Sequence, residues 1–422
     1  MKILAIETSC DETAICIIGA KGDFGPEFRY EVLGNALYSQ VAIHAPYGGV
    51  YPNLAKREHA RNLIPLLTQA LQQSNLLDQG PTLDPRSDLG VLLEREPELL
   101  EQLQTFLATY QKPEIDCIAV TYGPGLEPAL WVGVNLARAL AIVWELPLVA
   151  VNHMEGHVVM SMVEEVDSSQ LLVGSENSNA SSGNYQLTTI NFPMLSLLIS
   201  GGHTELVLSR QWQQYEVIGQ TRDDAVGEAF DKVARVLGLP YPGGPEISRL
   251  AQGVRNSFSQ EMRETVSHIT FTPPMLRSND FDFSFSGIKT EVRKYVEQLQ
   301  AGRSDLPGEN SLDDSVKADI ARAFEDAVTQ VLVAKTVRAV EEYGAQTVLV
   351  GGGVSANTYI RERLSHAIRK GPAFTDMKLL VPPAELATDN ALMIALAGYF
   401  HAIKEDFSDP ATLRANGNLH LA

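Results

Sequence analysis

Two histidines four residues apart, His153 and His157, have the spacing in this chain that most directly suggests chemistry. Side chains at positions i and i+4 of a helix lie on one face, about one turn apart. Both imidazoles can therefore reach a single metal ion. The pair follows an apolar, strand-like run at residues 146–151, so the histidines would open a helix directly after a strand. Taken alone, the pair also fits two histidines packed in a helical core.

The residues between the two histidines argue against a zinc protease. Proteases of the His-Glu-x-x-His type place the glutamate directly after the first histidine, where it faces the zinc-bound water. Here that position is Met154, and the glutamate is Glu155, about 100° further round the helix. The spacing therefore disfavours metal-dependent peptide hydrolysis.

The length and composition predict a globular protein of two domains. The chain has 422 residues, of which 45% are hydrophobic and 20% are charged. Its clearest apolar stretches are strand-sized, well short of the ~20 residues that a membrane helix needs. Because there is no signal-peptide layout and only three cysteines, we expect a cytoplasmic protein without a disulfide framework.

The formal net charge of −19 is unfavourable for a protein that binds nucleic acid by itself. Any nucleic acid would need a local basic surface or a partner that supplies one. Short basic stretches such as residues 56–57 and 361–363 lie among acidic residues and read as solvated faces.

Strands and helices alternate along the chain, which predicts α/β layers. We expect strands within residues 2–18 and at 115–122, 146–151, 194–208, 347–350 and 379–381, and helices at 53–73, 130–144, 153–157, 224–238, 313–342 and after 390. Residues 77–112 contain prolines and charges and read as an exposed insertion, and residues 164–187 read as a flexible loop. Residues 281–289 read as an aromatic and serine-rich loop.

Three glycine-rich turns follow predicted strands directly, at residues 123–125, 200–204 and 351–357. Backbone amides in such turns can hold the phosphates of a nucleotide, although each turn alone is also explained as a simple chain reversal. The first two strands are joined by residues 7–13, a loop of small and acidic residues that could bind phosphate or magnesium. Together these turns predict a nucleotide site.

A set of motifs now resembles one family, the TsaD family of tRNA adenosine threonylcarbamoyltransferases. The motifs lie in order at residues 6–13, 153–157, 200–204, 227–232, 241–244, 282–289, 351–357 and 388–390. The resemblance implies the actin/Hsp70/sugar-kinase (ASKHA) fold, with two α/β lobes around a nucleotide cleft. One lobe would comprise residues 1–152, with the insertion around 77–112, and be completed by about 390–422. The other lobe would comprise residues 153–389.

The resemblance also implies an activity and a metal. The family transfers the threonylcarbamoyl group from threonylcarbamoyl-AMP to N6 of adenosine 37 in tRNAs that read codons beginning with A. By motif, the metal ligands are His153, His157 and Asp389, although Asp389 alone would read as a helix N-cap. Fe²⁺ is favoured and Zn²⁺ is the alternative, because two imidazoles and one carboxylate suit either ion.

The resemblance also implies which residues of this chain contact the nucleotide. They are Leu198, Ile199, Ser200, Gly201, Gly202, Asp231, Gly244 and Asn357. Ser248 departs from the aspartate that many members have there, which puts one contact to the ribose in doubt. Glu12 is the candidate for a general base, with plain loop structure as the alternative. Lys289 is either a solvent-exposed lysine or a phosphate or tRNA contact.

The partners implied by the resemblance are tRNA, a short non-catalytic paralogue (TsaB-like), a small P-loop ATPase (TsaE-like) and an upstream synthase that makes threonylcarbamoyl-AMP, with no membrane. A composite surface would offset the acidity of this chain, so we expect the isolated chain to bind tRNA weakly. Two further hypotheses are a small-molecule kinase or ATPase of the same fold and a silent scaffold like the short paralogue. The first does not need the histidine pair and the second generally lacks it, so a metal assay separates them from the transferase.

Overall fold

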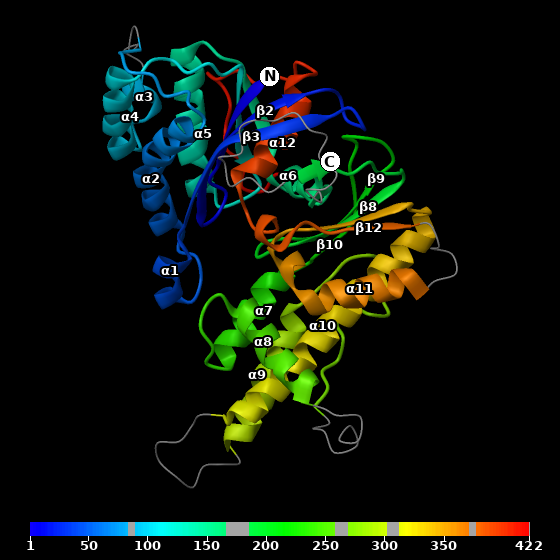
Figure 1. The fold of residues 1–422 in the computed structure, drawn as a ribbon. Coiled ribbons are helices and arrows are strands. Elements are labelled where there is room, and N and C mark those ends of the chain that lie inside the picture. The colour runs from blue at the N-terminus through cyan, green and yellow to red at the C-terminus, as the bar shows by residue number, and fades with distance from the viewer. Residues whose placement is uncertain (83–88, 166–184, 258–268, 302–311, 371–376, 422) are drawn as a thin grey trace. The chain divides into compact units, whose positions relative to one another are not determined.

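The computed structural model describes residues 1–82, 89–165, 185–257, 269–301, 312–370 and 377–421. The chain forms two compact units, each with its own sheet (Figure 1). The first unit comprises Met1–Ala42, Val50–Thr189 and Thr388–Leu421, and the second comprises Ile43–Gly49 and Ile190–Ala387.

The first unit is built on a five-stranded sheet of order β3-β2-β1-β4-β5. Its strands are β1 (Lys2–Glu7), β2 (Glu12–Lys21), β3 (Arg29–Ser39), β4 (Cys117–Gly123) and β5 (Leu148–Asn152). β1, β2 and β3 pair antiparallel, whereas β4 and β5 extend the sheet in parallel from β1. The central strands are continuous apolar runs because helices cover both of their faces.

Helices α2 (Pro52–Gln73) and α5 (Glu127–Trp144) pack on this sheet, and α4 (Pro97–Thr109) packs on α2. Helix α12 (Ala391–Ala402) packs against β1, β2 and β4 and is buried almost all round. A helix without a polar face has to lie inside a protein, which explains why this C-terminal segment returns to the first sheet.

The second unit repeats the same strand order, β10-β9-β8-β11-β12. Its strands are β8 (Met194–Ile199), β9 (Thr204–Ser209), β10 (Glu216–Gln220), β11 (Thr347–Gly351) and β12 (Lys378–Leu380). The first three again pair antiparallel and the last two in parallel. Its helices are α7 (Val226–Val236), α8 (Gly243–Ser257), α9 (Ser286–Ala301), α10 (Asp314–Tyr343) and α11 (Thr358–Lys370). The predicted α/β fold of the ASKHA type is confirmed.

The two units differ from the predicted lobes at their boundaries. The prediction placed residues 153–389 together, but helix α6 (His153–Met160) belongs to the first unit because it packs on α12. Residues 388–389 belong there too, whereas residues 43–49 belong to the second unit. The Gly48 carbonyl accepts a hydrogen bond from Arg235 of α7, which explains the latter assignment.

The prediction that residues 77–112 form an exposed insertion is wrong for much of the segment. Helices α3 (Leu89–Leu92) and α4, with the residue that follows α3, bury apolar side chains in the core of the first unit: Leu89, Leu93, Leu99, Leu103, Phe106 and Leu107. Within α4 the spacing of three to four residues makes an amphipathic face that packs inward. The buried Glu96 pairs with Lys56 of α2 at 2.9 Å and accepts a hydrogen bond from Asn135 of α5 at 3.1 Å. Residues 83–88 lie outside the described part.

Two other predicted loops contain regular structure. β6 (Val163–Glu165) and β7 (Tyr185–Leu187) pair antiparallel at the ends of the predicted loop 164–187, while residues 166–184 lie outside the described part. Residues 281–289 are a loop only as far as Phe285, because α9 begins at Ser286. Within the described residues, no helix has both the length and the apolar content to cross a membrane.

Candidate functional site

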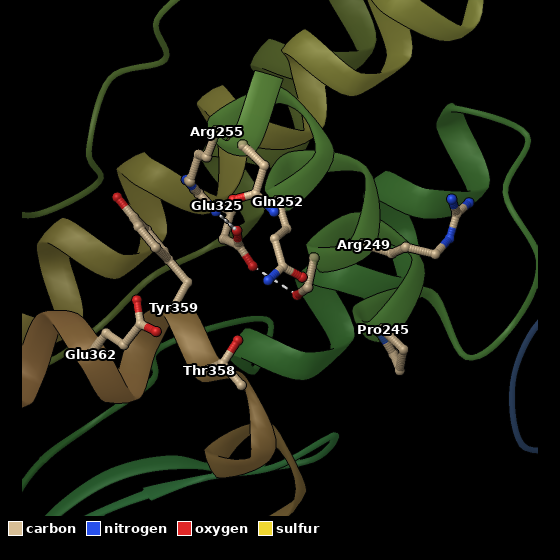
Figure 2. A pocket seen from close by; sticks show the side chains of 10 residues that line it. Pro245, Arg249, Gln252, Arg255, Glu325, Thr358, Tyr359 and Glu362 are labelled. Carbon is tan, nitrogen blue, oxygen red and sulfur yellow. Dashed lines mark hydrogen bonds and ion pairs between the residues drawn. The ribbon is translucent and has the colours of Figure 1, made fainter. Parts of the chain in front are cut away.

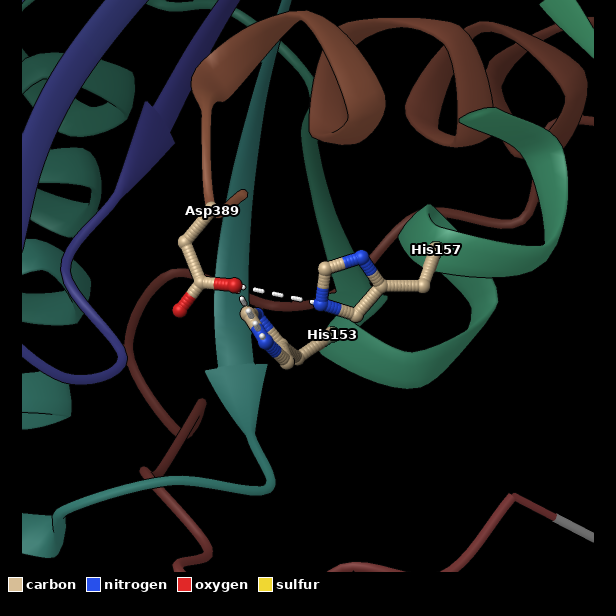
Figure 3. A group of neighbouring side chains, drawn as sticks. All are labelled: His153, His157 and Asp389. Atoms are coloured by element: carbon tan, nitrogen blue, oxygen red, sulfur yellow. Dashed lines mark ion pairs between the residues drawn. The ribbon is translucent and has the colours of Figure 1, made fainter. Parts of the chain in front are cut away.

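Helix α6 presents His153 and His157 on one face because its first residue is fixed by a cap. The Asn152 side chain accepts a hydrogen bond from the Met154 amide at 2.8 Å, so the helix begins at His153 directly after β5. Both imidazoles are buried, with relative exposures of 5% and 1%. The predicted strand-to-helix turn therefore places the two rings side by side (Figure 3).

Asp389 reaches the same point from the segment that precedes α12. Its Oδ1 lies 3.1 Å from His157 Nε2 and 3.4 Å from His153 Nε2. Asn390, and not Asp389, caps α12, because its side chain accepts a hydrogen bond from the Met393 amide at 3.1 Å. The alternative reading of Asp389 as a helix cap is thereby excluded, and its carboxylate is free to face the two rings.

The three predicted ligands have the geometry of a metal site. One ligand atom from each of His153, His157 and Asp389 lies within 4.8 Å of the others. His157 Nε2 is buried, and its contact to Asp389 Oδ1 at 3.1 Å lacks the geometry of a regular hydrogen bond. Coordination of an ion by both atoms would satisfy the buried nitrogen. Two imidazoles and one carboxylate form a donor set typical of Fe²⁺ or Zn²⁺ with open positions.

Glu7, which the sequence analysis treated only as part of a loop, orients one of these rings. It ends β1, is fully buried, and its Oε2 lies 3.3 Å from His153 Nδ1. The carboxylate also accepts hydrogen bonds from the Thr121 hydroxyl and, at 2.5 Å, from the Ser9 amide. A carboxylate behind a histidine fixes the ring and leaves the opposite nitrogen for a metal. The signal in the sequence was an acidic residue at the end of a buried apolar strand.

The electrostatics of the site favour a positive charge between two carboxylates. Burial alone would lower the pKa of His153, but Asp389 and Glu7 outweigh it and raise that pKa well above its ordinary value. Burial would raise the pKa values of Asp389 and Glu7, yet the charge of His153 keeps both below their usual range. A divalent cation supplies the same positive charge, and its binding would release the proton from the ring.

The candidate base Glu12 lies at the start of β2, and its Oε1 accepts a weak hydrogen bond from the Ser39 hydroxyl at 3.3 Å. Burial, followed by the charges of Asp11 and Asp389, raises the pKa of Glu12 to about 10. A carboxyl with this pKa is protonated at neutral pH. Glu12 could accept a proton only after a nearby positive charge had lowered its pKa.

A second polar link joins α6 to the far end of α12. Glu155, which is 4% exposed, accepts a hydrogen bond from His401 Nε2 at 2.8 Å. The other ring nitrogen of His401 lies 2.8 Å from Asp406 Oδ2. Burial lowers the pKa of His401, but Glu155 and then Asp406 outweigh it and raise the pKa to about 9.

This link predicts a loss of stability in alkali. Since the folded pKa of His401 lies above the unfolded value of about 6.5, its stabilising effect is complete below that pH and is lost as the pH rises through about 9. Without added metal, the wild type should lose about 2 kcal/mol relative to His401→Gln between pH about 7 and about 9.5. Denaturation at both pH values measures this difference. Parallel pH curves for the two proteins would contradict it.

The predicted nucleotide residues all lie in the second unit. Leu198 and Ile199 are buried within β8, so only their backbone can face a ligand. Gly201 and Gly202 form the turn between β8 and β9, and a Cβ at either would meet nothing within 4 Å. Ser200 closes this turn, because its hydroxyl accepts a hydrogen bond from the His203 amide at 3.0 Å. The exposed backbone of the turn is therefore open to a ligand.

The turn at residues 351–357 lies beside the first because β8 and β11 are parallel neighbours. Gly352 approaches the Ile199 carbonyl so closely that a Cβ would lie 2.5 Å from it, and its φ of +86° also requires glycine. The two predicted phosphate-side turns thus meet at one edge of the second sheet.

Asp231 and Gly244 lie on adjacent helices. Asp231 of α7 accepts a hydrogen bond from the Gly243 amide at 2.7 Å and so holds the first turn of α8, which contains Gly244. Asp231 therefore fixes the position of Gly244, whatever contact either makes to a nucleotide.

Asn357 joins α8 and α10 at the start of α11. Its Nδ2 donates hydrogen bonds to Ser248 Oγ at 2.9 Å and to Glu325 Oε1 at 2.8 Å, and its Oδ1 accepts one from the Ile360 amide at 3.0 Å. Ser248, the departure from the family, donates to the same Glu325 oxygen at 2.7 Å. A carboxylate thus remains beside position 248, although it comes from α10. The sequence analysis missed Glu325.

A cavity of about 400 Å³ opens between α8 and the start of α11 (Figure 2). Its lining includes Ser248, Arg255, Glu325 and Tyr359. The Arg255 guanidinium lies 3.4 Å from the centre of the Tyr359 ring and 2.5 Å from Glu325 Oε2. The volume is within the range of small-molecule sites.

Lys289 is not a free solvent-exposed lysine, because its Nζ lies 3.2 Å from Asp224 Oδ2, and its contact to phosphate or tRNA stays a prediction. The same carboxylate pairs with Lys232 at 2.7 Å. The aromatic segment before α9 is held separately by Asp223, which accepts hydrogen bonds from the Ser284 and Ser286 hydroxyls at 2.5 and 2.6 Å. This part of the predicted motif therefore has a structural explanation.

The fold and these sites define an α/β protein of the ASKHA class with a candidate metal centre in one unit and a candidate nucleotide pocket in the other. The chain belongs to the TsaD family, described as tRNA N6-adenosine threonylcarbamoyltransferase, whose model matches residues 31–79, 97–175 and 171–396. The family assignment makes the protein a transferase that acts in tRNA modification.

Solved structures are similar only at low identity. Component A of (R)-2-hydroxyglutaryl-CoA dehydratase from Acidaminococcus fermentans covers 96% of this chain and 99% of its own, at 11% identity and a TM-score of 0.42. The ROK hexokinase from Thermus thermophilus covers 96% and 100%, at 12% identity and a TM-score of 0.39. YeaZ from Pseudomonas aeruginosa covers 51% and 65%, at 10% identity and a TM-score of 0.24. The family assignment rests on the sequence match and not on these structures.

Proposed function

We propose that this chain transfers the threonylcarbamoyl group from threonylcarbamoyl-AMP to N6 of adenosine 37 in tRNAs that read codons beginning with A, in a metal-dependent reaction. The observation that carries the proposal is the convergence of His153, His157 and Asp389 at one buried point, in a chain of the TsaD family. The favoured ion is Fe²⁺, with Zn²⁺ as the alternative, because this donor set suits both.

The transfer reaction depends more on positioning of the reactants than on acid–base catalysis. The exocyclic amine of adenine is a weak nucleophile, whereas AMP is a good leaving group. The amine nitrogen forms a bond to the carbamoyl carbon while the bond from that carbon to the phosphate oxygen breaks. AMP leaves with the electron pair, and the amine proton passes to a base, for which Glu12 is the candidate. When bound, the metal ion would polarise the carbonyl group under attack.

The residues of this chain would hold the reactants. His153, His157 and Asp389 would bind the ion, and Glu7 would fix the ring of His153. In the second unit, the open backbone of the turn at residues 200–202 would receive phosphate oxygens. The cavity beside Ser248 and Asn357 would receive the nucleoside of the donor, with the Glu325 carboxylate close by. Fixed polar groups of this kind lower a barrier without reorganising during the reaction.

The proposal includes the partners that the family resemblance implies. They are tRNA, a short TsaB-like paralogue, a small TsaE-like ATPase and a synthase that supplies threonylcarbamoyl-AMP, all in the cytoplasm and away from any membrane. The net charge of −19 supports a composite tRNA surface, because a chain this acidic attracts polyanions poorly by itself.

The test is reconstitution with purified partners, unmodified tRNA, threonine, bicarbonate and ATP, followed by mass spectrometry of the tRNA nucleosides. We expect threonylcarbamoyl-adenosine to form, to disappear after the protein is stripped with a chelator, and to return when Fe²⁺ or Zn²⁺ is added. A tRNA with guanosine at position 37 is the negative control. Undiminished transfer by fully metal-free protein would remove the metal from the proposal, and no transfer under any metal would overturn the reaction.

A further inference from the structure

Helix α6 makes polar contacts near both ends of α12, and we call these two contacts the first and the second joint. Only the first joint contains the candidate metal ligands. From this geometry we infer that His401 is a positioning residue, which holds the register of α6 against α12 and thereby the spacing of the metal ligands. The inference rests on the proposed metal role of His153, His157 and Asp389.

The first joint is the ligand cluster itself. Asp389 stands just before α12, and its Oδ1 lies 3.1–3.4 Å from the Nε2 atoms of the two histidines of α6. The second joint lies near the last turn of α12, where His401 Nε2 and Glu155 Oε2 are 2.8 Å apart. Glu155 stands between the two histidines in sequence, so its direction is tied to theirs by the helix.

Between the two joints the helices are in close contact. Gly156 faces α12, and a Cβ there would lie 3.1 Å from side-chain atoms of both Met393 and Ile394. The whole of α6 is buried, and α12 is buried along nearly its full length. Packing of this density resists sliding. The directional hydrogen bond of the second joint adds a further constraint on the rotation of α6, beside the Asn152 cap and the first joint.

His401 is itself fixed from its other side. Its Nδ1 lies 2.8 Å from Asp406 Oδ2, and the Asp406 amide donates to the His401 carbonyl at 3.1 Å. Two residues further on, the Ser408 amide donates to the Leu148 carbonyl of β5 at 2.7 Å. Since β5 leads directly into α6, the chain after α12 is anchored to the strand that carries the histidines. The ring of His401 thus has one orientation between two carboxylates.

Loss of His401 would leave the buried Glu155 carboxylate without its imidazole partner. Removal of one side of a buried polar pair is unfavourable, so α6 would rotate or shift to restore the contacts of the carboxylate. Metal coordination tolerates displacements of only about 0.2 Å, and loss of supporting partners around a metal site typically lowers affinity about 10- to 100-fold. His401 would therefore influence metal binding without touching the ion.

The test is a double-mutant cycle of His401→Gln and Glu155→Gln, with Co²⁺ as the probe. Affinity is measured by competition with a chromophoric chelator, and ligand geometry by the visible absorption of the bound Co²⁺. We expect each single variant to lower the affinity at least about tenfold and to shift the spectrum, and the double variant to be no worse than either single variant. His420→Gln, an exposed histidine of the same unit, should behave as the wild type.

Unchanged Co²⁺ affinity and spectrum in both single variants, with only a lower thermal midpoint, would show a merely structural role and overturn the inference. If His401→Gln does not fold, Glu155→Gln carries the same test, because it keeps the size of the side chain. The proposed metal role fails separately, if the wild type does not bind Co²⁺ or if His157→Ala binds it equally well. If the wild type binds Co²⁺ through His157, and if His401→Gln and Glu155→Gln bind it with unchanged affinity and spectrum, only the positioning role of His401 is refuted.

Discussion

His157→Ala should abolish both metal binding and threonylcarbamoyl transfer. The substitution removes one of three candidate protein ligands at a buried point, where His157 is 1% exposed and its Nε2 lies 3.1 Å from Asp389 Oδ1. A site with two protein ligands loses most of its affinity, so the bound metal should fall to a small fraction of the wild-type amount and transfer should fall at least about 100-fold. Elemental analysis of the purified protein and mass spectrometry of tRNA nucleosides measure the two quantities.

The matched control is His366→Ala, which removes an exposed histidine from α11 in the other unit and should change neither quantity. His153→Ala should resemble His157→Ala, with the added cost that Glu7 loses its imidazole partner. If a His153→Ala, His157→Ala protein remained fully active, the proposed role of the metal in transfer would be refuted.

The histidine pair could be predicted from the sequence because its geometry is local. Asn152 caps the helix and the spacing of four residues sets the common face, so nothing distant is needed. Asp389 could not be found in this way, since the sheet and α12 bring it to the histidines from the far end of the chain. The family resemblance supplied it, and local propensity would have assigned it to a helix cap that Asn390 in fact provides.

The supporting residues were missed for the same reason. The sequence places Glu7 at a strand end, but its pairing with His153 depends on β5 lying two strands away in the sheet. His401 is the polar residue near the end of an apolar helix, and only packing turns it toward Glu155.

The α/β type of the fold and the positions of most elements were predictable, because apolar runs and glycine turns mark the elements, whereas the strand order came from the structure. The buried face of α4 was overlooked because the prolines and charges around it suggested an exposed insertion.

Glu325→Ala should disrupt the nucleotide pocket of the second unit more than any other single change there. Glu325 is fully buried in α10 and accepts hydrogen bonds from Ser248, Asn357 and Arg255 at 2.7, 2.8 and 2.5 Å. Removal of the acceptor leaves three donors without it, one of them a half-buried guanidinium that would keep its ion pair with Asp326 at 2.6 Å. Breaking one side of a buried ion pair costs about 3–5 kcal/mol, so this pocket should open locally and the KM for the donor should rise at least about tenfold.

Hydrogen exchange of peptides from α8, α10 and α11 measures the local opening, and initial rates at varied threonylcarbamoyl-AMP measure KM. Glu325→Gln keeps the shape and one acceptor oxygen and should have a clearly smaller effect on both. Glu341→Ala, at an exposed position of the same helix, should have none. Because the metal ligands belong to the first unit, metal content should stay at the wild-type value in all three variants. If Glu325→Ala showed faster hydrogen exchange but an unchanged KM, the pocket would not be the binding site of the donor. The buried carboxylate would then stabilise the fold only.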